Sequence, residues 1–61
     1  MTAAITDQEF VQVINSALTR ASVNEIANRL GVSLPTITRW SNNQNLPMPA
    51  TRKAAVKELQ K

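Results

Sequence analysis

The side chains best suited to chemistry in this 61-residue sequence lie in the segment 34–42, which reads Leu-Pro-Thr-Ile-Thr-Arg-Trp-Ser-Asn. Successive residues of an α-helix advance by about 100°, so Arg39 and Asn42 would share with Pro35 a face about 140–200° from Ile37. An arginine fork can bind O6 and N7 of a guanine, and neutral polar side chains can bind base edges or phosphates. No acidic residue occurs in the segment. The pattern predicts a surface that contacts nucleic acid, flanked by two threonines, Thr36 and Thr38.

The composition excludes most routes to catalysis. The chain contains no cysteine and no histidine, so it lacks a thiol nucleophile, an imidazole base, disulfides and the usual zinc ligands. We therefore expect a protein that is not an enzyme and that uses no metal, cofactor or small-molecule ligand. A chain of this length buries only about 60% of the surface that its unfolded form exposes, which leaves a thin margin of stability and room for one domain, residues 1–61.

The sequence also gives expectations about location. It begins without a basic region followed by an apolar stretch, and no apolar run approaches the roughly 20 residues that a membrane span needs. We therefore expect a soluble, cytoplasmic protein that does not contact membranes.

Positive charge is concentrated in the second half of the chain. The net charge is only +3, but residues 31–61 contain a single acid, Glu58, whereas the first half contains more acidic than basic residues. A positive surface attracts phosphate backbones, and a solvated basic face is the alternative explanation. The stripe formed by Lys53, Lys57 and Lys61 is expected to be such a solvated face rather than a second DNA contact.

The start of the chain predicts a first helix at about 7–20. Thr6 and Glu9 have the spacing of a capping box, in which each residue binds the backbone amide of the other. Between Phe10 and Leu18, apolar residues recur with the period of one buried helix face.

A second helix is predicted at 23–30. Ser22 and Glu25 have the spacing of another capping box, and Gly31 tolerates the left-handed backbone that follows a helix end. The expected apolar face of this helix consists of Val23, Ile26, Ala27 and Leu30.

Two further helices complete the predicted all-α class. Ser33 is a candidate N-cap for a third helix at about 34–42, in which Pro35 occupies the first turn. The prolines that follow in the turn-rich stretch 42–49 prevent its continuation, and a fourth helix is expected at about 50–60.

The segment 22–43 has the pattern of a helix-turn-helix. Ala27 is small where the two helices would cross, Gly31 stands in the turn, and Ile37 and Trp40 follow in the second helix. On these residues the segment resembles the helix-turn-helix of the lambda-repressor-like family, which includes phage repressors, Cro proteins and small bacterial regulators. The chain has four expected helices where the family usually has five.

The resemblance implies that the helix at 34–42 enters the major groove and that the start of the preceding helix approaches a phosphate. From the residues themselves, Arg39 is expected to read a base, with a phosphate contact or solvent exposure as alternatives. Leu34 and Pro35 could offer apolar surface to a thymine methyl group, although the angle of Leu34 also suits the core. The predicted base contacts are Arg39, Thr38, Pro35, Thr36 and Leu34.

Neutral groups are expected to fix the register on the DNA backbone. The predicted phosphate contacts are Ser22, Asn24, Ser33, Asn42 and Asn43. The serines are equally explained as helix caps and the last two asparagines as helix terminators. Where the two earlier helices have glutamate in the capping box, the third has Thr36, which leaves its N-terminus electropositive. Trp40 is expected in the core because its angle is close to that of Ile37.

These features predict sequence-specific binding of double-stranded DNA by a small transcriptional regulator, with two protomers on a palindromic site if the protein dimerises. Two alternatives remain open. The fold could serve as a protein-interaction module, favoured by the low net charge and the apolar pair at 34–35. It could also be the DNA-binding accessory of a recombinase or transposition system, which would use the same mechanism.

Overall fold

The structure, a computed structural model, describes residues 5–60 and contains four helices in that range and no strand. The helices are α1 (Asp7–Leu18), α2 (Val23–Leu30), α3 (Leu34–Ser41) and α4 (Pro49–Leu59). The predicted all-α class is therefore confirmed. Lys61, the last member of the predicted lysine stripe, lies outside the described residues.

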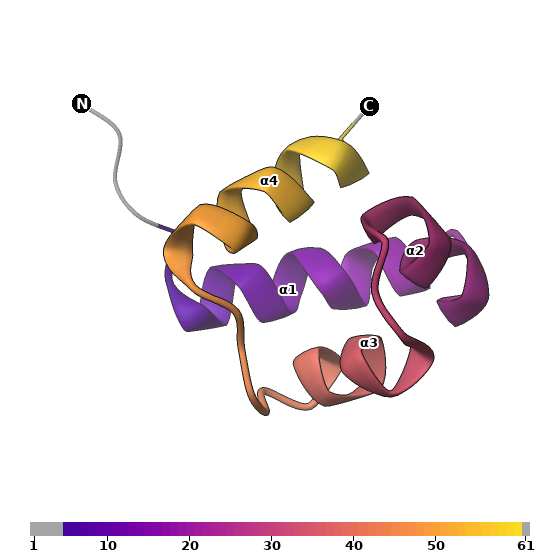
Figure 1. Cartoon of the computed structure of the whole chain (residues 1–61), viewed down its shortest axis with the longest axis horizontal. Helices are drawn as coiled ribbons and strands as arrows, with labels where there is room; N and C mark the ends of the chain where they lie inside the picture. Colours follow the sequence, from indigo (N-terminus) through magenta and orange to yellow (C-terminus); the bar gives the residue numbers. More distant parts are fainter. Residues whose placement is uncertain (1–4, 61) are drawn as a thin grey trace.

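The four helices are arranged around α1. In Figure 1, α1 runs through the middle of the molecule, with α4 along one side and α3 along the other. α1 and α2 each contact every other helix, whereas the backbones of α3 and α4 do not approach each other. The arrangement separates the exposed faces of α3 and α4. Within the described part of the chain, none of the helices has the length and apolarity that crossing a membrane requires.

The core joins apolar residues from all four helices. Phe10 and Ile14 of α1, Ile26 of α2 and Ile37 of α3 are almost completely buried. α4 contributes residues near its C-terminal end, Ala55 and Leu59. Burying a large aliphatic or aromatic side chain contributes about 1.5–3 kcal/mol, so these residues carry much of the stability of a small domain. Val23 was predicted on the apolar face of α2, but this is wrong: it is exposed, because it begins the helix and extends beyond the core.

Hydrogen bonds at the N-terminus of α1 confirm the first capping box. The Thr6 hydroxyl accepts from the Glu9 backbone amide at 3.1 Å, and the Thr6 amide donates to the Glu9 carboxylate at 3.0 Å. The backbone N–H of Thr6, with its hydroxyl second, lowers the pKa of Glu9 from its ordinary value of 4.5. The pKa of Glu9 is therefore lower in the folded than in the unfolded protein. The ionised carboxylate stabilises the fold at neutral pH, and this stabilisation is lost as the pH falls through the folded pKa of Glu9.

The caps of α1 and α2 differ from the prediction in two details. Ser22 caps α2 by accepting from the Glu25 amide at 3.1 Å, but the return bond from the Ser22 amide to the Glu25 carboxylate is not formed among the described residues. α1 ends at Leu18 rather than near residue 20. The Thr19 hydroxyl donates to the Ser16 carbonyl at 2.6 Å, and the backbone amide of Thr19 bonds the same carbonyl, which tightens the last turn. The chain must then become extended at Ser22 to cap the next helix.

A glycine closes α2 in a left-handed conformation. Gly31 has φ +70°, its amide donates to the Asn28 carbonyl at 3.3 Å, and the Val32 amide donates to the Ala27 carbonyl at 3.0 Å. These two bonds form a Schellman motif, which satisfies the last carbonyls of the helix. Only three residues therefore separate α2 from α3.

Substituting Gly31 tests this turn. A Cβ atom at Gly31 would meet nothing within 4 Å, so the whole cost of Gly31→Ala comes from its positive φ. We expect a loss of about 1–2 kcal/mol in the free energy of unfolding, measured by urea titration with circular dichroism. Gly31→Asn should cost less because asparagine tolerates this conformation. Equal stability of the alanine variant and the parent would contradict the assigned turn.

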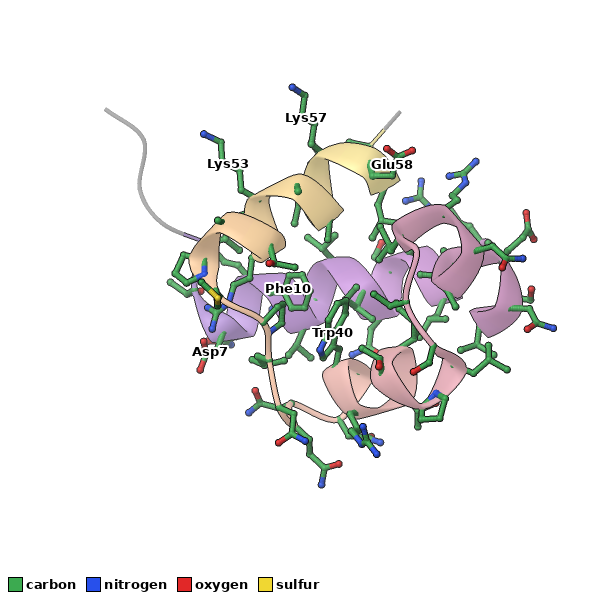
Figure 2. All side chains as sticks on the ribbon, viewed as in Figure 1. Asp7, Phe10, Trp40, Lys53, Lys57 and Glu58 are labelled. Atoms are coloured by element: carbon green, nitrogen blue, oxygen red, sulfur yellow. The ribbon has the colours of Figure 1, made fainter. Side chains whose placement is uncertain are left out.

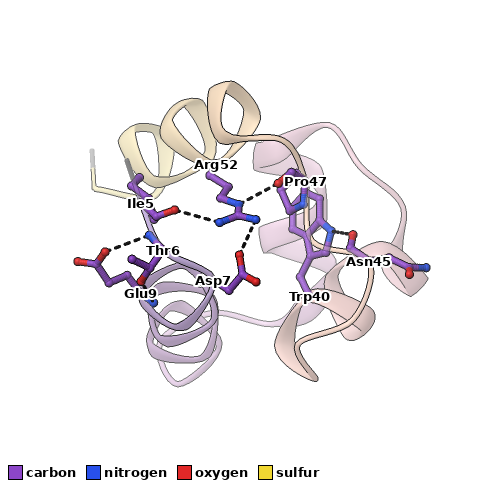
Figure 3. Close-up of polar contacts among 8 residues, drawn as sticks. All are labelled: Ile5, Thr6, Asp7, Glu9, Trp40, Asn45, Pro47 and Arg52. Carbon is purple, nitrogen blue, oxygen red and sulfur yellow. Dashed lines mark hydrogen bonds and ion pairs between the residues drawn. The ribbon is translucent and has the colours of Figure 1, made fainter. Parts of the chain in front are cut away.

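A partly buried arginine clasps the N-terminal ends of α1 and α4 (Figure 3). The Nε atom of Arg52 donates to the Pro47 carbonyl at 2.8 Å, and one Nη donates to the Ile5 carbonyl at 3.0 Å. The other Nη lies 2.6 Å from the Asp7 carboxylate. The Arg52 side chain is only 15% exposed, whereas that of Asp7 is 66% exposed. Arg52 therefore holds together segments that are distant in the sequence.

Arg52→Met should destabilise the fold more than removal of its acidic partner. The substitution leaves two carbonyls without their charged donor, and we expect a loss of about 2–3 kcal/mol in unfolding free energy. Asp7→Asn is the matched control, because a largely exposed ion pair contributes at most about 1 kcal/mol. Equal losses for both variants in chemical denaturation would contradict a stabilising role for the two carbonyl bonds of Arg52.

Candidate nucleic-acid interface

α3 divides into a buried side and an exposed side as its angular pattern predicts. Ile37 and Trp40 are buried in the core. Pro35 and Arg39, one helical turn apart, are both exposed. Within residues 5–60, no hydrogen bond or ion pair holds the Arg39 guanidinium, so its five donors face solvent. Arg39 is thus placed where an external acceptor can reach it.

Trp40 anchors the buried side of α3 to the rest of the protein. Its ring packs edge to face on Phe10 of α1, with centroids 5.2 Å apart and planes at 70°. Its indole N–H donates to the Asn45 carbonyl at 3.1 Å, as Figure 3 shows. The tryptophan therefore joins α3 to α1 and to the loop before α4. The prediction that Trp40 belongs to the core is confirmed.

The predicted hydroxyl groups of α3 bond first to α3 itself. The hydroxyls of Ser33 and Thr36 lie 2.8 Å apart, and Ser33 accepts weakly from the Thr36 amide at 3.4 Å. The Thr38 hydroxyl donates to the Leu34 carbonyl at 3.3 Å. Thr36 is half-buried, whereas Ser33 and Thr38 are exposed. A ligand contact from Thr36 or Thr38 would therefore share or replace a bond that each already makes.

The structure resolves the ambiguous position of Leu34. Its side chain is 42% exposed, so it does not belong to the core. Pro35 is exposed beside it in the first turn of α3. The N-terminal end of α3 consequently presents carbon atoms to solvent and contains no acidic residue in its first turn.

The predicted phosphate contacts are all exposed and lie at the start of α2, the start of α3 and the end of α3. They are Ser22, Asn24, Ser33, Asn42 and Asn43. After α3, the Asn43 amide donates to the Trp40 carbonyl at 3.1 Å and the Gln44 amide to the Arg39 carbonyl at 2.8 Å. Asn43 adopts φ +62°, which asparagine tolerates better than most residues, so its role as a helix terminator is confirmed.

Those basic residues of the second half that the structure describes do not form one patch. Arg52 is engaged in its clasp. Lys53 and Lys57 project from α4 on the side of the molecule opposite α3, as Figure 2 shows. The charge available on the α3 face is therefore that of Arg39 and of the helix N-terminus, rather than the charge of the whole C-terminal half.

No family model matches this chain, and comparisons with curated proteins and with solved structures found no match.

Sequence reasoning did not find three contacts that position this face. These are the Arg52 clasp, the bond from Trp40 to Asn45, and a bond of 3.3 Å from the Asn15 side-chain amide of α1 to the Ser41 carbonyl at the end of α3. Apart from the ion pair of Arg52 with Asp7, these contacts are made to backbone carbonyls, which every residue possesses. No residue type at these carbonyls could have indicated the contacts, and only the polar side chain of Asn15 and the opposite charges of Asp7 and Arg52 offered a hint.

The exposed side of α3 offers a guanidinium that has no partner among residues 5–60, a first turn without acidic residues, and apolar side chains in that turn. The helix is anchored to the core through Ile37 and Trp40 on its buried side. Such a surface is electrostatically complementary to an anionic partner, with Arg39 as the group able to bind a planar acceptor pair.

Proposed function

We propose that this protein binds double-stranded DNA sequence-specifically, with α2 and α3 acting as a helix-turn-helix and α3 entering the major groove. The observation that carries the proposal is the exposed, acid-free face of α3, on which Arg39 has no partner within the described residues. In this arrangement Arg39 contacts a guanine, and the starts of α2 and α3 contact phosphates. The resemblance of 22–43 to lambda-repressor-like regulators supports a role in transcription regulation.

The turn between the helices supports this proposal physically. Gly31 ends α2 with a left-handed residue, and after the short turn α3 packs on α2, with Ile26 and Ile37 buried in the same core. A helix held in this way can enter a groove of the DNA without rearrangement, so little conformational entropy is lost on binding. The polar groups of Ser22 and Asn24 at the start of α2 are exposed and able to meet a backbone phosphate.

A protein-interaction module is the second candidate, favoured by the exposed Leu34 and Pro35. It would use the apolar turn rather than Arg39 and would not require DNA. An accessory role in recombination or transposition shares the DNA-binding mechanism and differs only in its biological use.

A salt series tests the binding of DNA. Fluorescence anisotropy with a labelled duplex of mixed sequence should show binding at low ionic strength that weakens steadily as salt is added, because phosphate contacts release counterions. Absence of binding even at low salt would eliminate the proposal.

Two variants with the same change in charge locate the binding face. Arg39→Ala should weaken binding to the mixed duplex by about fivefold, the equivalent of about 1 kcal/mol for one lost contact. Lys53→Ala, on the opposite side of the molecule, should change affinity less than twofold because α4 lies away from the duplex. Both residues are exposed, so both variants should keep the parental circular dichroism spectrum. Equal losses for the two variants would contradict a binding face on α3.

A further inference from the structure

The first turn of α3 exposes apolar side chains to solvent, at a place where a DNA-binding helix could have hydrogen-bonding side chains. Leu34 is 42% exposed and Pro35 is exposed beside it. The neighbouring hydroxyls take part in the helix's own bonds: Ser33 with Thr36 at 2.8 Å, and Thr38 with the Leu34 carbonyl at 3.3 Å. A ligand that approaches this end of α3 therefore meets an apolar surface bordered by an electropositive helix N-terminus.

We propose that Leu34 and Pro35 read the 5-methyl group of a pyrimidine in the major groove, a selection for thymine over uracil and for 5-methylcytosine over cytosine. This inference rests on the proposed DNA binding. The thymine methyl group is the apolar feature that base pairs expose in the major groove. The same face carries Arg39 and no acid in its first turn, which makes a polyanion its electrostatic complement. DNA carries both phosphates, which complement Arg39, and thymine methyl groups, which complement Leu34 and Pro35.

The spacing on the helix predicts the spacing on the DNA. Pro35 and Arg39 are four residues apart and lie on nearly the same face. At about 1.5 Å per residue they are separated by roughly 6 Å along the helix axis, which spans at most about two base-pair steps of about 3.4 Å. We therefore expect the bound sequence to hold a thymine within about two base pairs of the guanine that Arg39 contacts.

The test uses sites selected from a random duplex pool with the full chain. The most enriched duplex is synthesised once with thymine and once with deoxyuridine in its place, and affinities are measured by anisotropy. The parent should bind the thymine duplex about fourfold more tightly for each methyl group that it buries. Because both residues are exposed, the double variant Leu34→Ala, Pro35→Ala should fold, and its thymine preference should fall to nearly one.

Two controls isolate the effect. Arg39→Ala should weaken binding to both duplexes by the same factor and keep the thymine preference. Met48→Ala removes a 71% exposed apolar side chain from the loop before α4 and should change neither affinity nor preference.

The outcomes separate this inference from the function on which it rests. If the parent binds the thymine and deoxyuridine duplexes equally, or if the double variant keeps the preference, the methyl-reading role of Leu34 and Pro35 is wrong while DNA binding stands. If no duplex is enriched and none binds at low salt, both proposals are wrong. Equal binding of both duplexes would also be the result if this apolar turn served a protein partner.

Discussion

Trp40→Ala is expected to unfold most of the protein at room temperature. Trp40 is 5% exposed, its ring centroid lies 5.2 Å from that of Phe10, and its indole N–H donates to the Asn45 carbonyl. Removing the side chain would therefore leave a cavity between α1 and α3 and take the donor from that carbonyl. Removing a large aromatic side chain from a core typically costs about 3–5 kcal/mol. A domain of this size has about 3–5 kcal/mol of stability in total. The circular dichroism spectrum of the variant should show lost helix content.

Trp40→Phe separates the packing of the ring from its hydrogen bond. Phenylalanine keeps most of the aromatic contact with Phe10 but cannot donate to Asn45, and we expect it to cost about 1–2 kcal/mol while remaining folded. Urea denaturation provides both values. A fully folded Trp40→Ala variant with near-parental stability would show that Trp40 does not anchor α3 as described.

The second large effect is expected from an acid at the start of α3. Thr36→Glu would place a carboxylate where Glu9 stands in α1, so it could complete a capping box with Ser33 and leave stability unchanged or slightly raised. The same carboxylate would face the DNA backbone. At a few ångströms from a phosphate its repulsion amounts to about 2 kcal/mol, or roughly a thirtyfold loss of affinity.

The neutral variant Thr36→Gln is the matched control, because glutamine can also complete a capping box but carries no charge. We expect it to bind duplex DNA within about threefold of the parent, since it removes one hydroxyl and adds no repulsion. Thermal unfolding of both variants checks that the fold is intact. If Thr36→Glu binds duplex DNA as tightly as Thr36→Gln, the N-terminus of α3 does not approach phosphates.

The helices were the most predictable part of the fold, because their signals are local. The bounds of α2 are those predicted, since a serine cap and a following glycine fix both ends within a few residues. The end of α1 was less predictable, because the bond from the Thr19 hydroxyl to the Ser16 carbonyl tightens its last turn and the period of apolar residues does not report such a bond. The exposure of Val23 and Leu34 depends on how far each helix start extends beyond the core, which is a tertiary property.

The exposure of the candidate residues on α3 was largely predictable, whereas the distribution of charge around them was less so. The angular pattern correctly placed Ile37 and Trp40 inside and Arg39 outside. The positive charge of the C-terminal half was a poorer guide to the charge on the α3 face. The sequence does not show that Arg52 binds carbonyls of the chain, nor that Lys53 and Lys57 of α4 face away from α3. Long-range contacts of this kind depend on the packed arrangement of helices rather than on local spacing.

A map of backbone amide chemical shifts, recorded while the labelled protein is titrated with duplex DNA at low salt, tests whether α3 is the DNA-binding surface. We predict changes at the starts of α2 and α3, along α3 and in the turn that follows it, in residues 22–24 and 33–43. The amides around Lys53 and Lys57 should not move, because they lie on the opposite side of the molecule. A spectrum that does not change, or changes centred on α4, would contradict the assignment of α3 as the DNA-binding surface.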